Sequence, residues 1–288
     1  MKQAFAALAI TALIFVPPAA GGEIEIERMT SPEVAAAIQA GATAIILPTG
    51  GTEQNGPHMV LGKHNVIVAE TARRIAGKLG QTLVAPVLAY APEGDIAKRE
   101  GHMAYAGTIS VSPAVFTAVL EEAAKSFRAH GFKTIVFLGD SGPNQEPQRA
   151  LAVNLTAAWA GEGVRVLSPA AYYGANGGLD WLKSQGETEA QIGTHAAIRD
   201  TSELMALDPA GIRPGKMAAG KDGVIGDPTR ASAERGEKLL GLKVEAAVRD
   251  IEAALKAPLP AGSGTTPDAS GGGTTEGFFA RLWRWLFG

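Results

Sequence analysis

The chain has 288 residues, 46% of them hydrophobic, and a formal net charge of -3. This length can bury one substantial core or two small ones, and the charge provides no basic surface for nucleic acid. The chain contains no cysteine, which excludes disulfides, thiolate metal sites and a cysteine nucleophile. Any catalytic metal would therefore have to rest on histidine, aspartate and glutamate.

Residues 1–22 are predicted to be a secretory signal peptide. Lys2 precedes an apolar run from Ala4 to Val16, and the small residues from Ala19 to Gly22 suit cleavage. The run is too short to span a bilayer comfortably, and the alternative is an uncleaved N-terminal anchor. We expect an exported protein, located in the periplasm.

Residues 23–257 are predicted to form an α/β domain with a mainly parallel β-sheet flanked by helices, because apolar runs rich in Ile and Val alternate with segments of helical period. Continuously apolar strands also imply burial on both faces. The strands are expected at 44–47, 82–88, 134–138 and 164–167. The helices are expected near 32–40, 65–79, 113–130, 146–160 and 233–255.

Polar groups with metal-binding capacity are concentrated in the Gly-rich loop 49–65, TGGTEQNGPHMVLGKHN, directly after the first expected strand. A loop at the carboxyl end of a parallel strand faces the crevice where α/β proteins bind ligands. Glu53, His58 and His64 are ligand types for zinc, manganese or iron, and Glu53 could instead act as a general base. The alternative is an ordinary polar loop that caps a helix.

A second polar loop, Gly139–Asn144 (GDSGPN), follows the strand expected at 134–138. Asp140 would lie beside the first loop if the two strands are neighbours. The GDSG sequence also resembles the nucleophile loop of chymotrypsin-like serine proteases, but those are all-β proteins, whereas here it ends a buried strand and begins a helix. Ser141 as a nucleophile paired with a nearby histidine stays open, although the chain lacks a GxSxG elbow.

Two further segments add polar groups that could serve the same site. His102 lies in the loop 91–110, which is long enough to cover a site, and His195 and Asp200 lie in 194–205. We expect a turn or helix start there, with Asp200 near the cap of a helix from Ser202 onward. Taken singly, each histidine could be an ordinary hydrogen-bonded residue, and capping alone could explain Asp200.

The C-terminal residues divide into two further segments. Residues 258–276 are rich in Gly, Ser, Thr and Pro and are predicted to be a flexible linker. Residues 277–288, GFFARLWRWLFG, form a basic aromatic tail that is too short to cross a membrane. Such a tail can lie in a membrane interface or dock in a partner's groove, or it can fold back on the domain.

Four motifs in chain order resemble those of the creatininase family of metal-dependent amidohydrolases. EQNGPHMVLGKHN is similar to its E-Q-H-G-P-H-L-P-L-G-T-D loop, and GHMAYAGTISVS to its H-x-x-F-P-G-T-I-S segment. GDSGPNQ stands where the family has N-G-H-G-G-N, and THAAIRDTSELM where it has H-A-G-x-x-E-T-S. A stretch from Gly223 also resembles the family's G-D-P segment, so the similarity runs from about Glu25 to Leu255.

The resemblance implies a creatininase-like layered single domain, often a homohexamer, with a two-metal site that activates water to attack an amide carbon. Glu53 matches a metal-binding carboxylate, Asp200 matches the carboxylate before Thr-Ser, and His195 matches a histidine close to the substrate. The chain departs from the family pattern elsewhere. Three residues, Asn55, His64 and Ser141, stand where the family has a ligand His, a bridging Asp and another His.

We therefore predict a rearranged site that binds zinc, with manganese or iron as alternatives and with one or two ions. The expected metal ligands are Glu53, His64, Asp140 and Asp200. The expected catalytic residues are His195, His102 and Glu53, and the expected pocket residues are Asn55, His58, Ser141 and Asn144. The predicted function is an exported amidohydrolase that cleaves the C–N bond of a small amide or cyclic amide. The alternative is a non-catalytic binding protein that retains the fold and the pocket.

Overall fold

The structure is a computed structural model that describes residues 22–261. The predicted signal peptide (apart from Gly22), the linker beyond residue 261 and the aromatic tail lie outside the described residues. Between residues 22 and 261, no helix is both long enough and apolar enough to cross a membrane.

A four-stranded parallel sheet in the order β2-β1-β3-β4 forms the centre of the molecule, which confirms the predicted α/β class. The strands are β1 (Ala44–Thr49), β2 (Thr82–Val84), β3 (Thr134–Gly139) and β4 (Arg165–Leu167). β2 is much shorter than the strand expected at 82–88. The reason is Pro86, which has no N–H to continue the ladder.

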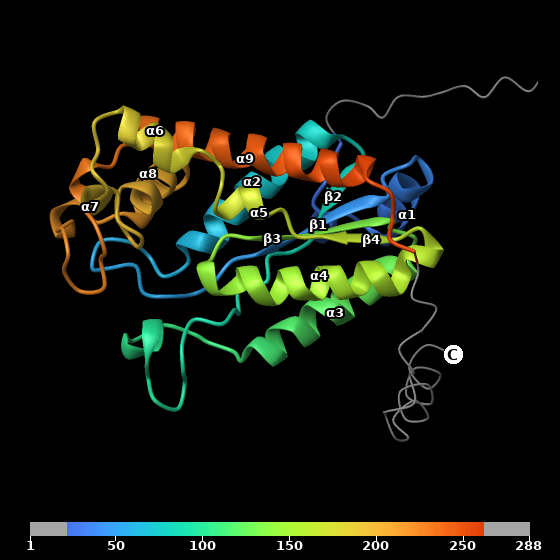
Figure 1. Cartoon of the computed structure of the whole chain (residues 1–288), viewed down its shortest axis with the longest axis horizontal. Helices are drawn as coiled ribbons and strands as arrows, with labels where there is room; N and C mark the ends of the chain where they lie inside the picture. The colour runs from blue at the N-terminus through green and yellow to red at the C-terminus, as the bar shows by residue number, and fades with distance from the viewer. Residues whose placement is uncertain (1–21, 262–288) are drawn as a thin grey trace, which may run out of the picture.

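Helices cover both faces of this sheet (Figure 1), with α3 and α4 on one face and α2, α5 and α9 on the other. The five helices predicted from their helical period lie within two residues of the expected positions. They are α1 (Ser31–Gln39), α2 (Lys63–Leu79), α3 (Pro113–Ala129), α4 (Gln145–Trp159) and α9 (Ala233–Lys256).

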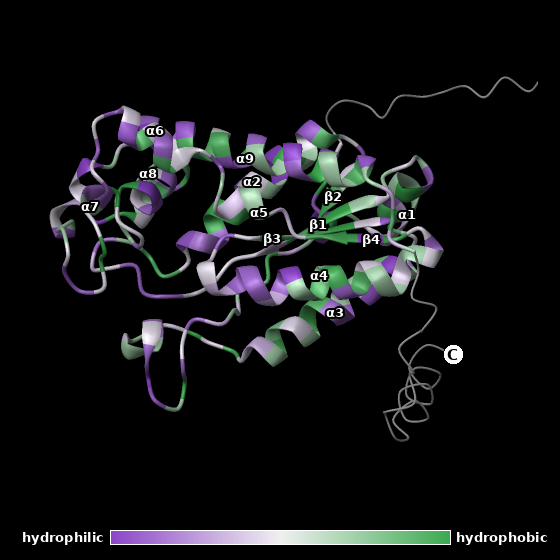
Figure 2. Cartoon of the chain, viewed as in Figure 1, coloured by the Kyte–Doolittle hydropathy of each residue, from purple (hydrophilic) through white to green (hydrophobic). Residues whose placement is uncertain are grey.

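The layering follows from the alternation of side chains along each buried strand. On β1, Ile45 and Leu47 pack toward α3 and α4, whereas Ile46 packs toward α2 and α9. Figure 2 shows the same pattern, with hydrophobic strands between helices whose outer surfaces are hydrophilic. Ile45 and Ile46 are fully buried, and each such side chain contributes about 1.5–3 kcal/mol relative to exposure.

Three short helices were not predicted, because segments of 4 to 7 residues are too brief to show a helical period. They are α5 (Ala170–Tyr173), α6 (Gly178–Ser184) and α7 (Glu189–Ile192), and they are followed by α8 (Ile198–Leu207). In Figure 1, α6, α7 and α8 lie beyond the carboxyl edge of the sheet, and α6 and α8 contact α9. The helix expected from Ser202 thus begins at Ile198, and Asp200 lies in its first turn, where its carboxylate accepts the backbone N–H of Ala196 at 2.7 Å.

The strand order fixes where a ligand crevice can form. β1 and β3 are neighbours along their whole length, and the chain proceeds from β1 to β2 on one side and from β3 to β4 on the other. This is the switch point at which open parallel sheets bind ligands. The predicted proximity of the two polar loops is confirmed, because the N–H of Asp140 donates to the carbonyl of Thr49 at 3.0 Å.

Candidate active site

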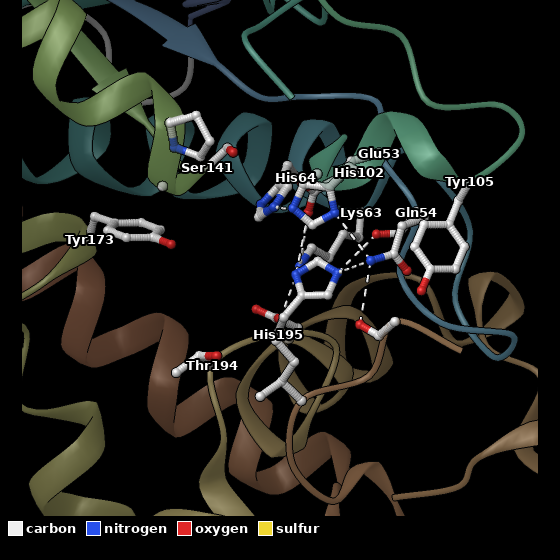
Figure 3. Close-up of a pocket in the computed structure, with 16 residues that line it drawn as sticks. Glu53, Gln54, Lys63, His64, His102, Tyr105, Ser141, Tyr173, Thr194 and His195 are labelled. Atoms are coloured by element: carbon white, nitrogen blue, oxygen red, sulfur yellow. Dashed lines mark hydrogen bonds and ion pairs between the residues drawn. The ribbon is translucent and has the colours of Figure 1, made fainter. Parts of the chain in front are cut away.

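A cavity of about 520 Å³ opens at the carboxyl edge of the sheet. Figure 3 shows side chains from distant parts of the chain converging on it. Of the predicted site residues, six line it: Glu53, His64, His102, Ser141, His195 and Asp200. The lining residues that the sequence did not single out include Gln54, Lys63, Tyr105, Tyr173 and Thr194.

Local hydrogen bonds fix the loop that carries Glu53. Asn55 is fully buried, and its side-chain amide donates to the carbonyls of Glu53 at 2.9 Å and Val60 at 3.1 Å. The N–H of Glu53 donates in turn to the carbonyl of Leu61 at 3.2 Å. Asn55 therefore closes the loop, and its side chain does not line the cavity.

Glu53 lies at the centre of the site and is 1% exposed. One carboxylate oxygen is 2.9 Å from His64 Nε2, and the other is 3.1 Å from His102 Nε2. Burial raises the pKa of Glu53, but His64 and Lys63 outweigh burial and hold it well below its usual range. Glu53 is therefore a carboxylate surrounded by nitrogen groups.

His102 and His195 are neutral imidazoles beside this carboxylate. Burial lowers the pKa of both, and with Lys63 nearby it lowers that of His195 to about 4. His195 Nε2 donates to the carbonyl of Gln54 at 2.9 Å, which leaves the lone pair on Nδ1, 3.7 Å from Glu53 Oε1. A backbone partner on the far ring nitrogen is the usual way a protein orients a metal-binding histidine.

Glu53, His102 and His195 form a group whose ligand atoms all lie within 4.8 Å of one another. Two ligands of a tetrahedral zinc ion, each about 2.05 Å from it, are roughly 3.3 Å apart. His102 Nε2 is 3.1 Å from Glu53 Oε2 and His195 Nδ1 is 3.7 Å from Glu53 Oε1, so each nitrogen lies near that distance from one of the two carboxylate oxygens. One carboxylate with two imidazoles is also an established catalytic zinc set, so these residues fit a single divalent ion.

His64 is bonded differently, because both of its ring nitrogens face carboxylates. Nδ1 is 2.8 Å from Asp140 Oδ2, and Nε2 is 2.9 Å from Glu53 Oε1. Burial and Lys63 lower the pKa of His64, but Glu53 and Asp140 outweigh them and raise it to about 9. The resulting imidazolium donates from both nitrogens and has no lone pair for a metal.

The other two expected ligands are paired with buried lysines. Asp140 accepts from Lys243 Nζ at 2.7 Å and from the Tyr172 hydroxyl at 2.9 Å. Asp200 accepts from Lys63 Nζ at 2.9 Å. Metal binding by His64, Asp140 and Asp200 stays a prediction, and the geometry favours Glu53, His102 and His195 instead.

Neither lysine was predicted as a site residue, although the position of Lys243 indicates its burial. Lys243 lies on the apolar stripe of α9 with Leu239, Leu240 and Val244, and a charged residue on a buried stripe calls for a partner. Lys63 has no such signal, since a lysine at the start of a helix after a polar loop resembles a surface residue. Its burial depends on the distant Asp200.

Glu93 is a further residue that the sequence did not single out. It is 1% exposed, its Oε1 has no partner among the described residues, and its Oε2 accepts the Ser141 hydroxyl at 3.3 Å. Burial and the neighbouring Glu53 raise its pKa to about 9, so it is a neutral acid at pH 7. Gly51 makes room for it, since a Cβ there would lie 2.1 Å from Glu93 Oε1.

Of the four expected pocket residues, only Ser141 lines the cavity. His58 is fully buried and its Nε2 lies 3.0 Å from the Thr201 hydroxyl, while the Asn144 amide donates to the Gly50 carbonyl at 2.7 Å. Substrate contact by Asn55, His58 and Asn144 stays a prediction that these bonds do not favour. No histidine between residues 22 and 261 hydrogen-bonds to Ser141, whose partner is Glu93.

Comparisons with known proteins bear on this site. A family model described as "Creatininase: Creatinine amidohydrolase" matches residues 27–251. The mycofactocin precursor peptide peptidase of Mycobacterium tuberculosis (strain H37Rv) is 27% identical over 231 residues, covering 72% of this chain and 84% of that protein. Creatinine amidohydrolase of Pseudomonas putida is 27% identical over 113 residues, covering 39% of this chain and 43% of that protein.

Solved structures share the fold. A crystal structure of creatinine amidohydrolase aligns with a TM-score of 0.65 and 23% identity, over 82% of this chain and 99% of that one. A mutant creatininase of Zn-Zn type aligns with a TM-score of 0.64 and 22% identity, over 82% of this chain and 100% of that one. A structure described as "Creatininase Mn" aligns with a TM-score of 0.65 and 22% identity, over 83% of this chain and 100% of that one.

Proposed function

From the premise that the chain belongs to the creatininase family of hydrolases, we propose that it uses one metal ion to hydrolyse the C–N bond of a small amide or cyclic amide. The observation that carries the proposal is the convergence of Glu53, His102 and His195 on one point of the cavity. These three residues would hold the ion. Zinc suits the set best, with manganese or iron as alternatives.

A divalent ion, when bound, supplies a water of lowered pKa and polarises the carbonyl oxygen of the substrate. The chain's own groups prepare the site for this chemistry. The Gln54 carbonyl accepts from His195 Nε2 at 2.9 Å and so orients His195. The Gln54 amide nitrogen lies 3.1 Å from His102 Nδ1, and it would turn away for His102 Nε2 to bind the ion. Lys63 adds a positive charge to the cavity wall, where negative charge would develop on the substrate oxygen.

The shape of the cavity supports a small substrate. Its volume of about 520 Å³ lies within the range of about 300–1,000 Å³ that is typical of small-molecule pockets. Tyr105 and Tyr173 provide aromatic walls. Burial raises the pKa of Tyr173, so its hydroxyl stays protonated and can donate a hydrogen bond. A mutant creatininase of the same fold is known in complex with creatine, a small molecule of this size class.

Metal analysis and a substrate screen test the proposal together. The purified protein is expected to retain about one zinc per chain and to hydrolyse at least one member of a panel of cyclic and linear amides. Chelation should abolish this hydrolysis and added zinc should restore it, because the ion activates the water. A protein that binds no divalent ion, or one that hydrolyses amides equally well after chelation, contradicts the proposal.

A non-catalytic binding protein is the second candidate. It is favoured by the state of Glu53, whose two carboxylate oxygens already lie within 3.1 Å of His64 and His102. In such a site the charge of Glu53 is neutralised by its protein partners, and the site could hold a ligand without hydrolysing it. A protein that is free of metal and inert toward the whole panel would support this reading.

Export, tail attachment and oligomerisation are further proposals, supported by the N-terminal composition, the aromatic tail and the family resemblance. Expression with a periplasmic fractionation is expected to give a product that begins near residue 21 or 22, as read by mass spectrometry. An intact N-terminus in the cytosolic fraction would contradict export.

Part of this product should sediment with membranes, and removal of residues 277–288 should release it. Light scattering on the purified product measures whether it is a hexamer.

A further inference from the structure

We propose that the ammonium group of Lys63 occupies the position of one cation in this site, so that the protein binds a single divalent ion where its fold can hold two. The inference rests on the proposed metal site at Glu53, His102 and His195. The new element is that one ion binds, because Lys63 excludes a second.

The first observation is the surroundings of Lys63. Its side chain is 1% exposed, and its Nζ lies 2.9 Å from Asp200 Oδ2 and 3.6 Å from Glu53 Oε1. The two carboxylates come from different parts of the chain, the loop after β1 and the first turn of α8. The ammonium is therefore enclosed by the oxygen donors that a divalent ion would use.

The second observation is that α2 gives no reason for a lysine at this position. Lys63 is the first residue of α2, and the positive end of the helix dipole disfavours a cation there. Burying the charge is also unfavourable unless it is paired. The two carboxylates are thus the groups that stabilise the buried ammonium, and the ammonium in turn neutralises charge at the site.

The third observation is charge repulsion at Asp200. A second divalent ion bound through Asp200 would face the Lys63 ammonium, which lies 2.9 Å from Asp200 Oδ2, at short range. A related creatininase of Zn-Zn type shows that this fold can accommodate two ions. In the present chain, the ammonium group of Lys63 takes the place of one of these ions.

Zinc stoichiometry tests the inference directly. The full-length protein and its Lys63→Met and Lys63→Gln variants are stripped with chelator, loaded with zinc, desalted and analysed by mass spectrometry of the metal. The wild type is expected to hold one zinc per chain and the neutral variants two. Anomalous scattering from crystals of a neutral variant should place the added ion on Asp200 and Glu53.

Lys63→Arg is the matched control, because it retains the positive charge, and it is expected to hold one zinc. A wild type with two ions, a folded neutral variant with one, or an arginine variant with two each overturns the inference. A wild type with no zinc overturns the proposed function as well, so the two failures are distinguishable.

Thermal stability gives a second readout that does not depend on activity. Without metal, Lys63→Met removes the cation that faces both Asp200 and Glu53, and its Tm should fall below that of the wild type. Added zinc should raise the Tm of this variant by more than it raises that of the wild type, because two ions bind instead of one. An equal rise in both proteins contradicts the inference. If Lys63→Met does not fold without metal, the same comparison is made with Lys63→Gln.

Discussion

The Glu53→Ala variant is expected to lose its bound metal, and its kcat/KM should decrease by more than about 100-fold. Changing a residue that only hydrogen-bonds to a metal ligand costs up to about 100-fold, and removing a ligand itself should cost more. Glu53 is the one carboxylate of the proposed ligand set, and it also faces His64 and Lys63. Alanine removes the anionic ligand and leaves His64 and Lys63 with one carboxylate partner each, Asp140 and Asp200. Isothermal titration with zinc and turnover of the best amide in the panel measure the two effects.

Glu70→Ala is the control for a general effect of removing a glutamate. Glu70 lies on α2 and pairs with Arg73 and Arg74 at the surface, so metal affinity and turnover should stay within about twofold of the wild type, as expected for surface ion pairs of little energetic weight. If Glu53→Ala binds zinc as tightly as this control, Glu53 is not a ligand and the proposed site is wrong.

Lys243→Met is expected to lower the free energy of unfolding by about 3–5 kcal/mol, the usual loss when one partner of a buried ion pair is removed. Lys243 donates to Asp140 at 2.7 Å and to Glu203 at 2.8 Å, and its side chain is 4% exposed. Methionine has a similar length but leaves both carboxyl groups without their shared cation. Urea unfolding, followed by far-UV circular dichroism, measures the change.

Lys125→Met provides the matched surface substitution. Lys125 pairs with Glu121 and Glu122 on α3, and its side chain is 47% exposed, so the expected loss is less than about 1 kcal/mol. A loss of this small size for Lys243→Met as well would show that the network around Asp140 contributes little to stability. The metal site would then be held in place by the loop and the sheet alone.

The fold was predictable because its signals are local. Long apolar runs and long helical periods identify β1, β3 and the five main helices, and the rule that parallel strands carry ligands at their carboxyl ends identifies the loops after β1 and β3. The end of β2, the start of α8 and the presence of α6 and α7 were not predictable in this way. These elements are short, and their stability comes from tertiary contacts and not from their own periodicity. β2 pairs with β1, α6 and α8 pack on α9, and α7 packs on α6 and α8.

The candidate site was predictable only in part. Sequence pattern and family resemblance both direct attention to Glu53, His102 and His195, but they give the same weight to His58, which the structure buries beside Thr201 and away from the cavity. They also cannot show that His64 lies between Glu53 and Asp140 with both nitrogens occupied. The sequence alone does not distinguish a histidine that binds a metal from a histidine that is paired with carboxylates.

The sequence by itself determined the α/β class, the family resemblance and the loop 49–65 as the place where the chemistry is concentrated, because each depends on residues that are near one another in the chain. Only the tertiary structure decided which charges meet there. Lys63 is paired with Asp200 and Lys243 with Asp140, across 137 and 103 positions of the chain. Since burial makes each charge depend on its partner, these long-range pairs decide which carboxylates are free to bind a metal.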